Sequence, residues 1–353
     1  MKKTWMDETI KYLVILVIAL VVGALLIIAR GEDPLQIGAL IVQKGLGTRS
    51  GIANTLRYAT PVIITGLAAA IAFRVNIANI GVEGQLYVGG LVSAILAYSL
   101  TSLAPLPLKL VSILGGGMAG AAFAMIPAFL LVKWGVNEIL TTMMLNYVAQ
   151  WGTEYIVRTF LMGGSTSLVP LQIATPDILS GAKLAKLMPP YDTNTSLIMG
   201  IVLCLAFYFI YRFTRFGYIL NTLGGNKKFA QYGGININQM TYLVFALSGF
   251  IGSLGGISEI LGVQGKFINS FSNGIGWNGL LVALIAKNNP IGVIFAGLFW
   301  GFLQNSGLIV ERAGNVDRWT FYVVQAVIVL LVTAKLYLKP PIDKARQKGC
   351  QAV

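Results

Sequence analysis

The stretch that decides the fold reads Phe73-Arg-Val-Asn-Ile-Ala-Asn-Ile-Gly-Val-Glu-Gly-Gln85. It lies between two apolar runs, Pro61–Phe73 and Leu86–Leu100, yet it is rich in ionic and amide side chains. Such groups are costly in hydrocarbon unless they find protein partners or water. Because Gly81 and Gly84 flank its acidic residue, we expect an interrupted helix here, with the polar groups turned toward protein.

Composition places the whole chain in a membrane. Of its 353 residues, 56% are hydrophobic and only 11% are charged, whereas soluble domains carry about 25% charged residues. We therefore expect an all-α integral membrane protein in which residues 1–353 form a single polytopic transmembrane domain. The net charge of +13 comes with no basic run interleaved with aromatic residues. It indicates contact with anionic membrane lipid and the positive-inside rule, and no nucleic acid.

The residue types that catalysis and metal binding require are scarce. The chain has no histidine, which excludes an imidazole base and a histidine metal site. Cys204 and Cys350 are far apart, so neither a disulfide framework nor a zinc site is indicated. No Gly-x4-Gly-Lys-[Ser/Thr] motif is present, so the chain carries no P-loop of its own. We expect a protein that is not an enzyme, with no catalytic residue, metal or cofactor.

Apolar runs predict about ten transmembrane helices. The run at Tyr12–Ala29 follows a basic N-terminus and is long enough to span, and no small-residue cleavage site ends it. We expect a retained first helix, with a cleaved signal peptide as the alternative. A short amphipathic helix is expected around Leu35–Gln43. Besides the two runs beside the opening stretch, the expected spans are Leu110–Val132, Glu138–Ile156, Thr195–Tyr211, Ile237–Leu261, the short and re-entrant Gly276–Ala286, Ile291–Gly307 and Trp319–Leu338.

The distribution of charge predicts the orientation. Alternating crossings place both chain ends on one side, together with the short basic loops at Lys133, Arg212–Asn236 and Lys287. The long Arg158–Asn194 segment and acidic residues such as Asp177 fall on the other side. The positive-inside rule assigns the basic side to the cytoplasm. We therefore expect a multi-pass plasma-membrane protein with both termini in the cytoplasm.

Glycine spacing gives two further indications. Small-xxx-small pairs at Gly116/Gly120, Gly252/Gly256 and Gly297/Gly301 favour close packing of neighbouring helices over a role in a pore. Ile80-Gly-Val-Glu-Gly84 and Ile275-Gly-Trp-Asn-Gly279 share the pattern Ile-Gly-x-x-Gly ahead of an apolar run. The predicted threading places these two motifs on opposite sides of the membrane, as in inverted repeats. A chance match of five residues is the alternative.

The opening stretch also carries a resemblance to a known family. Residues 74–85 resemble the signature of ATP-binding-cassette importer permeases for simple sugars and nucleosides, a group that includes ribose-type and BMP-type nucleoside permeases. Asn137–Tyr147, Gly224–Ile237 and Gly276–Pro290 are similar to other segments of that group. The resemblance implies a permease subunit that works with a cytoplasmic ATP-binding-cassette ATPase, which uses the ATP. It also implies an extracytoplasmic substrate-binding lipoprotein and a second permease half, either a homologous distinct chain or a copy of this one.

The expected solute is a nucleoside. The patterns at Asn137–Tyr147 and Gly224–Ile237 look closer to the nucleoside branch of the family, and a simple, ribose-like sugar is the alternative. A rival from another class is an ion-coupled secondary transporter driven through Glu83 or Glu259.

Polar side chains at membrane depth are the candidates for a substrate pathway. A carboxylate such as Glu83 is a functional candidate by default, although it is also placed to cap the backbone N–H groups of its own turn. Proton coupling and substrate contact are the other interpretations of this residue. Interhelical hydrogen bonding is an equal alternative for the weaker candidates. The predicted pathway residues are Asn76, Asn79, Glu83, Gln85, Asn146, Gln150 and Glu259.

The basic segment Arg212–Asn236 contains a short helix candidate, Asn226–Tyr232, between two glycine pairs. Asn226 suits a helix N-cap and Gly233 a helix stop. A compact helix of this kind can dock into a groove of a soluble partner by a small apolar face, and a solvated basic loop is the plainer alternative. The family resemblance implies a cytoplasmic coupling helix that contacts the ATPase. The expected coupling residues are Gly224, Asn226, Lys227, Lys228, Phe229, Ala230, Tyr232 and Gly234.

Overall fold

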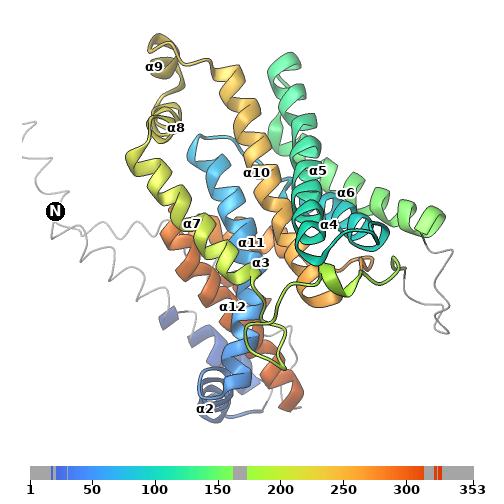
Figure 1. Ribbon diagram of the computed structural model, residues 1–353. Coiled ribbons are helices and arrows are strands. Elements are labelled where there is room, and N and C mark those ends of the chain that lie inside the picture. The colour runs from blue at the N-terminus through green and yellow to red at the C-terminus, as the bar shows by residue number, and fades with distance from the viewer. Residues whose placement is uncertain are drawn as a thin grey trace, which may run out of the picture.

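The computed structural model describes residues 17–18, 21–29, 31–161, 173–313, 322–323 and 325–327. Its helices are α2 (Pro34–Gly45), α3 (Arg49–Arg74), α4 (Val82–Ser99), α5 (Pro105–Trp134), α6 (Glu138–Ile156), η1 (Val157–Leu161), η3 (Ser180–Ala182), α7 (Ser196–Phe213), α8 (Arg215–Gly225), α9 (Lys227–Tyr232), α10 (Ile237–Glu259), η4 (Ile260–Gln264), α11 (Ile275–Ile285) and α12 (Pro290–Ala313). Figure 1 shows α8 and α9 at one end of the molecule, the α9 end, and α2 at the other, the α2 end.

The all-α integral membrane fold is confirmed. Within the described ranges, five helices are long and apolar enough to cross a membrane, namely α3, α5, α7, α10 with its η4 extension, and α12. α11 is a shorter apolar helix, as its re-entrant prediction requires. The expected spans Tyr12–Ala29 and Trp319–Leu338 are described only in part, and both chain ends lie outside the described residues. The count of ten helices and the location of the termini therefore stay predictions.

α3 starts well before the apolar run that predicts it. The hydroxyl of Thr48 caps the helix by accepting a hydrogen bond from the Gly51 nitrogen at 3.0 Å. Pro61 lies inside the helix, where its ring removes one backbone donor. The hydroxyl of Thr65 donates to the Pro61 carbonyl at 2.9 Å. The Thr48 cap starts the helix in a polar segment, and the helix then continues past Pro61 into a buried middle.

The helices form two triplets with the same arrangement. In the first triplet, α3–α4–α5, both α4 and α5 pack against α10. In the second triplet, α10–α11–α12, both α11 and α12 pack against α3. Each triplet thus packs against the first helix of the other, so that α3, α4 and α5 correspond to α10, α11 and α12. α3 ends beside α8, and α10 begins directly after α9, so the two triplets run in opposite directions (Figure 1). Both α4 and α11 begin at the repeated Ile-Gly-x-x-Gly motif. The motif therefore marks equivalent helices of an inverted repeat.

The small-residue pairs lie where the triplets pack. A Cβ on Gly120 would come within 2.8 Å of the Gly249 carbonyl, and one on Gly256 would collide with the Leu86 backbone. A Cβ on Gly301 would lie 2.6 Å from the backbone of α3. These contacts confirm that the glycine spacing serves close helix packing. A core of buried apolar side chains runs through all of these contacts.

Candidate functional site

The break between α3 and α4 is built by amide side chains. Asn79 is fully buried, and its Oδ1 accepts from the Gly81 nitrogen at 3.0 Å and from the Gln85 side chain at 3.1 Å. Its Nδ2 donates to the Ser248 hydroxyl of α10 at 2.8 Å, and that hydroxyl donates to the Ala68 carbonyl of α3 at 2.8 Å. The polar groups of the opening stretch are thus satisfied by protein, as an interruption inside the membrane requires.

α6 closes the other side of the same break. The Asn146 side chain accepts from the Gly84 nitrogen at 2.8 Å and donates to the Ile80 carbonyl at 3.0 Å. The Thr142 hydroxyl accepts from the Ile80 nitrogen at 3.2 Å. Backbone groups that a continuous helix would pair internally are paired here with side chains of a neighbouring helix. The start of α4 is therefore held in place by α6.

Glu83 fastens α4 to α11. Its Oε2 accepts a hydrogen bond from the Gly276 nitrogen at 2.6 Å, and the Ser272 hydroxyl and the Gly274 and Trp277 nitrogens lie close enough to interact with the carboxylate. The carboxylate lies in the first turn of α4 and against the first turn of α11. The N-terminal ends of two helices, both electropositive, thus surround it. The prediction that Glu83 caps its own turn is corrected here, because the donors come from α11.

The repeated motifs meet at this point. A Cβ on Gly276 would come within 2.6 Å of the Glu83 nitrogen, so only glycine allows the two helix starts to approach this closely. The predicted threading puts the motifs on opposite sides of the membrane, whereas in the structure they touch. Because each helix begins inside the fold after a break, an inverted repeat brings the two starts together.

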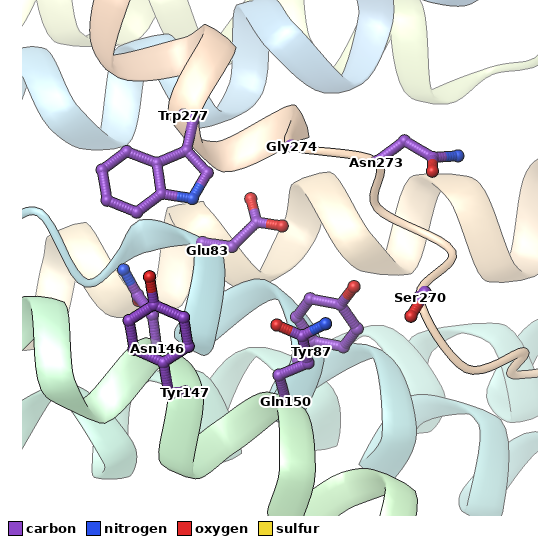
Figure 2. Close-up of a pocket in the computed structure, with 9 residues that line it drawn as sticks. All are labelled: Glu83, Tyr87, Asn146, Tyr147, Gln150, Ser270, Asn273, Gly274 and Trp277. Atoms are coloured by element: carbon purple, nitrogen blue, oxygen red, sulfur yellow. The ribbon is translucent and has the colours of Figure 1, made fainter.

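A cavity of about 270 Å³ opens beside this contact. Figure 2 shows Glu83 between Trp277 and the side chains of α6, with Ser270 and Asn273 on the loop that leads into α11. The residues that line it are Glu83, Tyr87, Asn146, Tyr147, Gln150, Ser270, Asn273, Gly274 and Trp277. Ser270 and Asn273 have positive φ angles of 58° and 46°, a strained conformation that often marks functional loops.

The polar groups of the cavity fall into two sets. Glu83 is engaged with the start of α11 through the Gly276 nitrogen, and Asn146 is engaged with the α4 backbone. The side chains of Gln150, Ser270 and Asn273 make no hydrogen bond with any other described residue. These uncharged groups, together with the exposed ring of Trp277, are available to a ligand. The cavity thus suits a neutral solute that has both a ring and hydroxyl or amide groups.

Three of the seven predicted pathway residues, Glu83, Asn146 and Gln150, line the cavity. The other four lie elsewhere. Asn79 and Gln85 bond to each other inside the break, and Asn76 donates to the Gly224 carbonyl of α8 at 2.6 Å.

Glu259 is the fourth residue outside the cavity. It forms an ion pair with Arg57 at 3.1 Å, and both side chains are largely buried. The pair joins the last turn of α10 to α3 toward the α2 end, where the Thr193 hydroxyl also donates to the Ala53 carbonyl at 2.6 Å. The polar side chains of these four residues were predicted to line a substrate pathway. In the structure they instead bond to other residues of the chain, several of them distant in sequence.

The predicted coupling segment contains two helices. α9 is capped as expected, because the Asn226 side chain accepts from the Phe229 nitrogen at 3.1 Å. α8, which is capped by Thr214, was not predicted from the sequence. Gly234 adopts a φ of +80° just beyond α9, a left-handed conformation that favours glycine. Lys227 and Lys228 are exposed.

The apolar face of α9 differs from the prediction. Ala230 is fully buried within this chain, where it joins the hydrophobic core. Phe229 is 63% exposed and Tyr232 is 92% exposed. A six-residue helix can pack against the other helices only if at least one of its side chains is buried. In α9 the buried residue is Ala230, which has the smallest side chain of the helix. A partner at the α9 end would therefore contact Phe229 and Tyr232. Ala230 is not available for that contact, contrary to the prediction.

Six cavity residues are not among those predicted from the sequence: Tyr87, Tyr147, Ser270, Asn273, Gly274 and Trp277. Two signals point to some of them. Tyr147 lies one position from Asn146 and three from Gln150, on the face of α6 that they define. Trp277 lies inside the second Ile-Gly-x-x-Gly motif. No sequence signal identifies Ser270 or Asn273, because their placement depends on how the loop folds back.

Comparisons with known proteins agree on one family. The profile described as "Branched-chain amino acid transport system / permease component" matches residues 51–333. The chain is 33% identical to the glucose ABC transporter permease protein TsgB13 of Haloferax volcanii, over 90% of this chain and 86% of that protein. It is 27% identical to the nucleoside ABC transporter permease protein NupB of Lactococcus lactis, over 95% and 93% of the two chains. It is 29% identical to the guanosine ABC transporter permease protein NupP of Bacillus subtilis, over 96% of each.

Proposed function

The chain belongs to the family of branched-chain amino acid transport system permease components, and on that basis we propose that it is the membrane-spanning permease subunit of an ATP-binding-cassette importer that takes up nucleosides. The match to the family profile runs through every described helix from α3 to α12. Relatives that are named nucleoside or guanosine permeases align with nearly the whole chain. The protein's own part is to provide a path through the membrane.

The cavity beside Glu83 is the observation that carries the choice of solute. A nucleoside has a flat, uncharged ring system that can stack on an aromatic ring such as Trp277, and hydroxyl and amide groups that can bond to Gln150, Ser270 and Asn273. The cavity lining includes a carboxyl group and no lysine or arginine that could neutralise a phosphate, which disfavours phosphorylated solutes. The proposed substrate is therefore the nucleoside and not the nucleotide.

A simple sugar is the second candidate. The higher identity to the glucose permease favours it, and a sugar would use the same uncharged donors and acceptors. A sugar would present a C–H face to Trp277 and not a flat aromatic ring system, so stacking there would contribute less than with a nucleobase.

The partners follow from the family. We propose a cytoplasmic ATPase at the α9 end, where Phe229 and Tyr232 are exposed and Lys227 and Lys228 add positive charge. A substrate-binding lipoprotein would deliver solute at the α2 end, where the segment 173–195 lies. A second permease half, a copy or a homologous chain, would complete the path. In this arrangement residues 1–353 act as one transmembrane domain with the α9 end in the cytoplasm.

Uptake by the reconstituted complex tests the solute. The permease, its ATPase and its binding lipoprotein are placed in liposomes, and the uptake of a radiolabelled nucleoside, of ribose and of glucose is measured with ATP inside the vesicles. Nucleoside uptake that an excess of unlabelled sugar does not reduce is the expected result. Uptake of ribose or glucose without nucleoside uptake would overturn the choice of solute and leave the family assignment intact.

The same vesicles test the energy source. Uptake should stop when ATP is omitted and should continue when an ionophore collapses the proton and sodium gradients. Uptake that persists without ATP and disappears with the ion gradient would favour a secondary transporter driven through Glu83.

A further inference from the structure

α11 is a short helix whose two ends are both fastened to other elements. At its N-terminal end the Gly276 nitrogen donates to Glu83 in the wall of the cavity. At its C-terminal end the chain turns through Lys287 and Asn288, which have positive φ angles of 51° and 58°. The helix has 11 residues, so it spans about 17 Å at a rise of about 1.5 Å per residue. It therefore connects the cavity to the α9 end of the molecule.

Arg74 holds the C-terminal end of α11. Its guanidinium donates to the Asn288 carbonyl at 3.4 Å and to the Asn221 side chain of α8 at 2.8 Å. The same guanidinium lies over the Tyr211 ring of α7, 4.3 Å from its centre. One side chain thus joins the end of α3, the end of α7, α8 and the turn after α11. The planar guanidinium can make these contacts together, whereas an ammonium group cannot reproduce that geometry.

α8 fits tightly against this junction. The Asn76 side chain donates to the Gly224 carbonyl at 2.6 Å. A Cβ on Gly224 would collide with the Arg74 carbonyl, whereas a Cβ on Gly225 would meet nothing within 4 Å. α8 therefore contacts the end of α3 directly, and α9 follows it after a single residue. A force on α9 would reach the junction without an intervening loop.

We propose that α11 links the ATPase contact to the solute cavity, with Arg74 and Glu83 as the positioning residues at its two ends. Displacement of α8 and α9 reaches the turn after α11 through Asn221 and Arg74. α11 then transmits this displacement to Glu83 and to the loop that contains Ser270 and Asn273. The inference rests on the proposed function, because it takes the exposed residues of α9 to be the ATPase contact.

The test measures the cavity itself. Ser270→Cys is introduced with Cys350→Ser, and Cys204 is retained because it is buried. The full complex is incubated with a maleimide, either without nucleotide or trapped with ATP and vanadate, and the labelling rate is recorded. In the otherwise unchanged chain the two rates should differ several-fold. Asn221→Ala should bring their ratio to unity while the ATPase still co-purifies, and it should abolish the solute-stimulated part of ATP hydrolysis.

Matched controls separate the inference from a general loss of structure. Asn238→Ala alters another exposed asparagine at the α9 end, and Gly225→Ala adds a methyl group where space is open. Both should keep the nucleotide-dependent labelling. Gly224→Ala should abolish the nucleotide dependence of labelling as Asn221→Ala does. If Asn221→Ala is poorly folded, Gly224→Ala provides the test of the link through α11.

The outcomes also separate this inference from the proposed function. If Tyr232→Asp releases the ATPase but Asn221→Ala and Gly224→Ala both keep nucleotide-dependent labelling, the link through α11 is overturned and the coupling contact stands. If Tyr232→Asp leaves both co-purification and labelling unchanged, the contact is elsewhere and the proposal for α11 fails with it.

Discussion

Glu83 Oε2 lies 2.6 Å from the backbone nitrogen of Gly276, a residue 193 positions further along the chain. This contact joins the first turns of two equivalent helices of the inverted repeat. It also forms one wall of the cavity proposed to bind the solute. A structural anchor and a proposed transport site thus share one carboxylate, so substitutions there must be interpreted through both stability and transport.

Replacement of Glu83 tests the anchor. Glu83→Gln replaces one carboxylate oxygen beside the N-terminal end of α11 with an amide NH2, and each N–H or O–H left unpaired costs about 1–3 kcal/mol. We expect lower thermal stability in detergent with part of the transport retained, and a larger loss of stability for Glu83→Leu. Glu138→Gln changes a glutamate in the first turn of α6 and serves as the control. A Glu83→Gln protein of normal stability that does not transport would show that the charge acts in transport itself.

The buried pair Arg57–Glu259 is expected to be structural. Glu259→Leu leaves a largely buried guanidinium unpaired, which costs about 3–5 kcal/mol, and Arg57→Leu should cost a similar amount. The double variant should recover much of that loss, as a double-mutant cycle of melting temperatures would reveal. Glu154→Gln, in the exposed pair with Arg158, should have little effect on stability. If the double variant is stable but inactive, Glu259 has a role in transport.

Cavity substitutions test solute contact. Gln150→Ala removes one uncommitted amide, and the loss of one hydrogen bond of about 0.5–1.5 kcal/mol predicts roughly a 2- to 10-fold fall in nucleoside uptake. Trp277→Ala should reduce nucleoside uptake more than Trp277→Phe, which keeps a ring. Trp151→Ala alters a neighbour on α6 that does not line the cavity, so it should leave uptake unchanged. Normal uptake by both Gln150→Ala and Trp277→Ala would exclude the cavity from the path.

The exposed residues of α9 should hold the ATPase. Burying a phenylalanine ring contributes about 1.5–3 kcal/mol, so Phe229→Asp should weaken co-purification of the ATPase while the permease stays folded. Ala230→Glu should instead lower stability, because Ala230 is buried in this chain. Size-exclusion chromatography of the complex and a melting curve of the isolated permease distinguish the two effects. Equal behaviour of the two variants would contradict the assignment of faces on α9.

Cysteine labelling tests the orientation. Asp177 is 80% exposed on the segment next to η3, and Lys133 lies in the last turn of α5. With an impermeant maleimide added outside whole cells, Asp177→Cys should react and Lys133→Cys should react only after the cells are opened. The reverse pattern would invert the proposed topology. The predicted location of Lys344 lies outside the described residues, and Lys344→Cys provides the same test for the C-terminus.

Sequence predicts the helices well because apolar runs and caps are local. The runs beside the opening stretch become α3 and α4, and Asn226 caps α9 as its residue type suggests. The partners of polar groups are not local. Asn79 bonds to Ser248 and Asn76 to Gly224, and these pairings exist only after distant helices pack. For this reason the sequence identifies Asn146 and Gln150 as cavity residues by their shared helix face but cannot separate them from Asn79.

The bond between Asn79 and Ser248 also orders events during synthesis. The two residues are 169 positions apart, and at about 5–20 residues per second roughly 10–30 s pass between their translation. Throughout that interval the amides of the break between α3 and α4 lack their α10 partner, although an unpaired polar group in lipid is costly. The first triplet must therefore wait at the membrane interface or beside the insertion machinery until α10 arrives. A nascent chain released after α6 should consequently be recognised as unassembled and degraded, even though it already contains several complete helices.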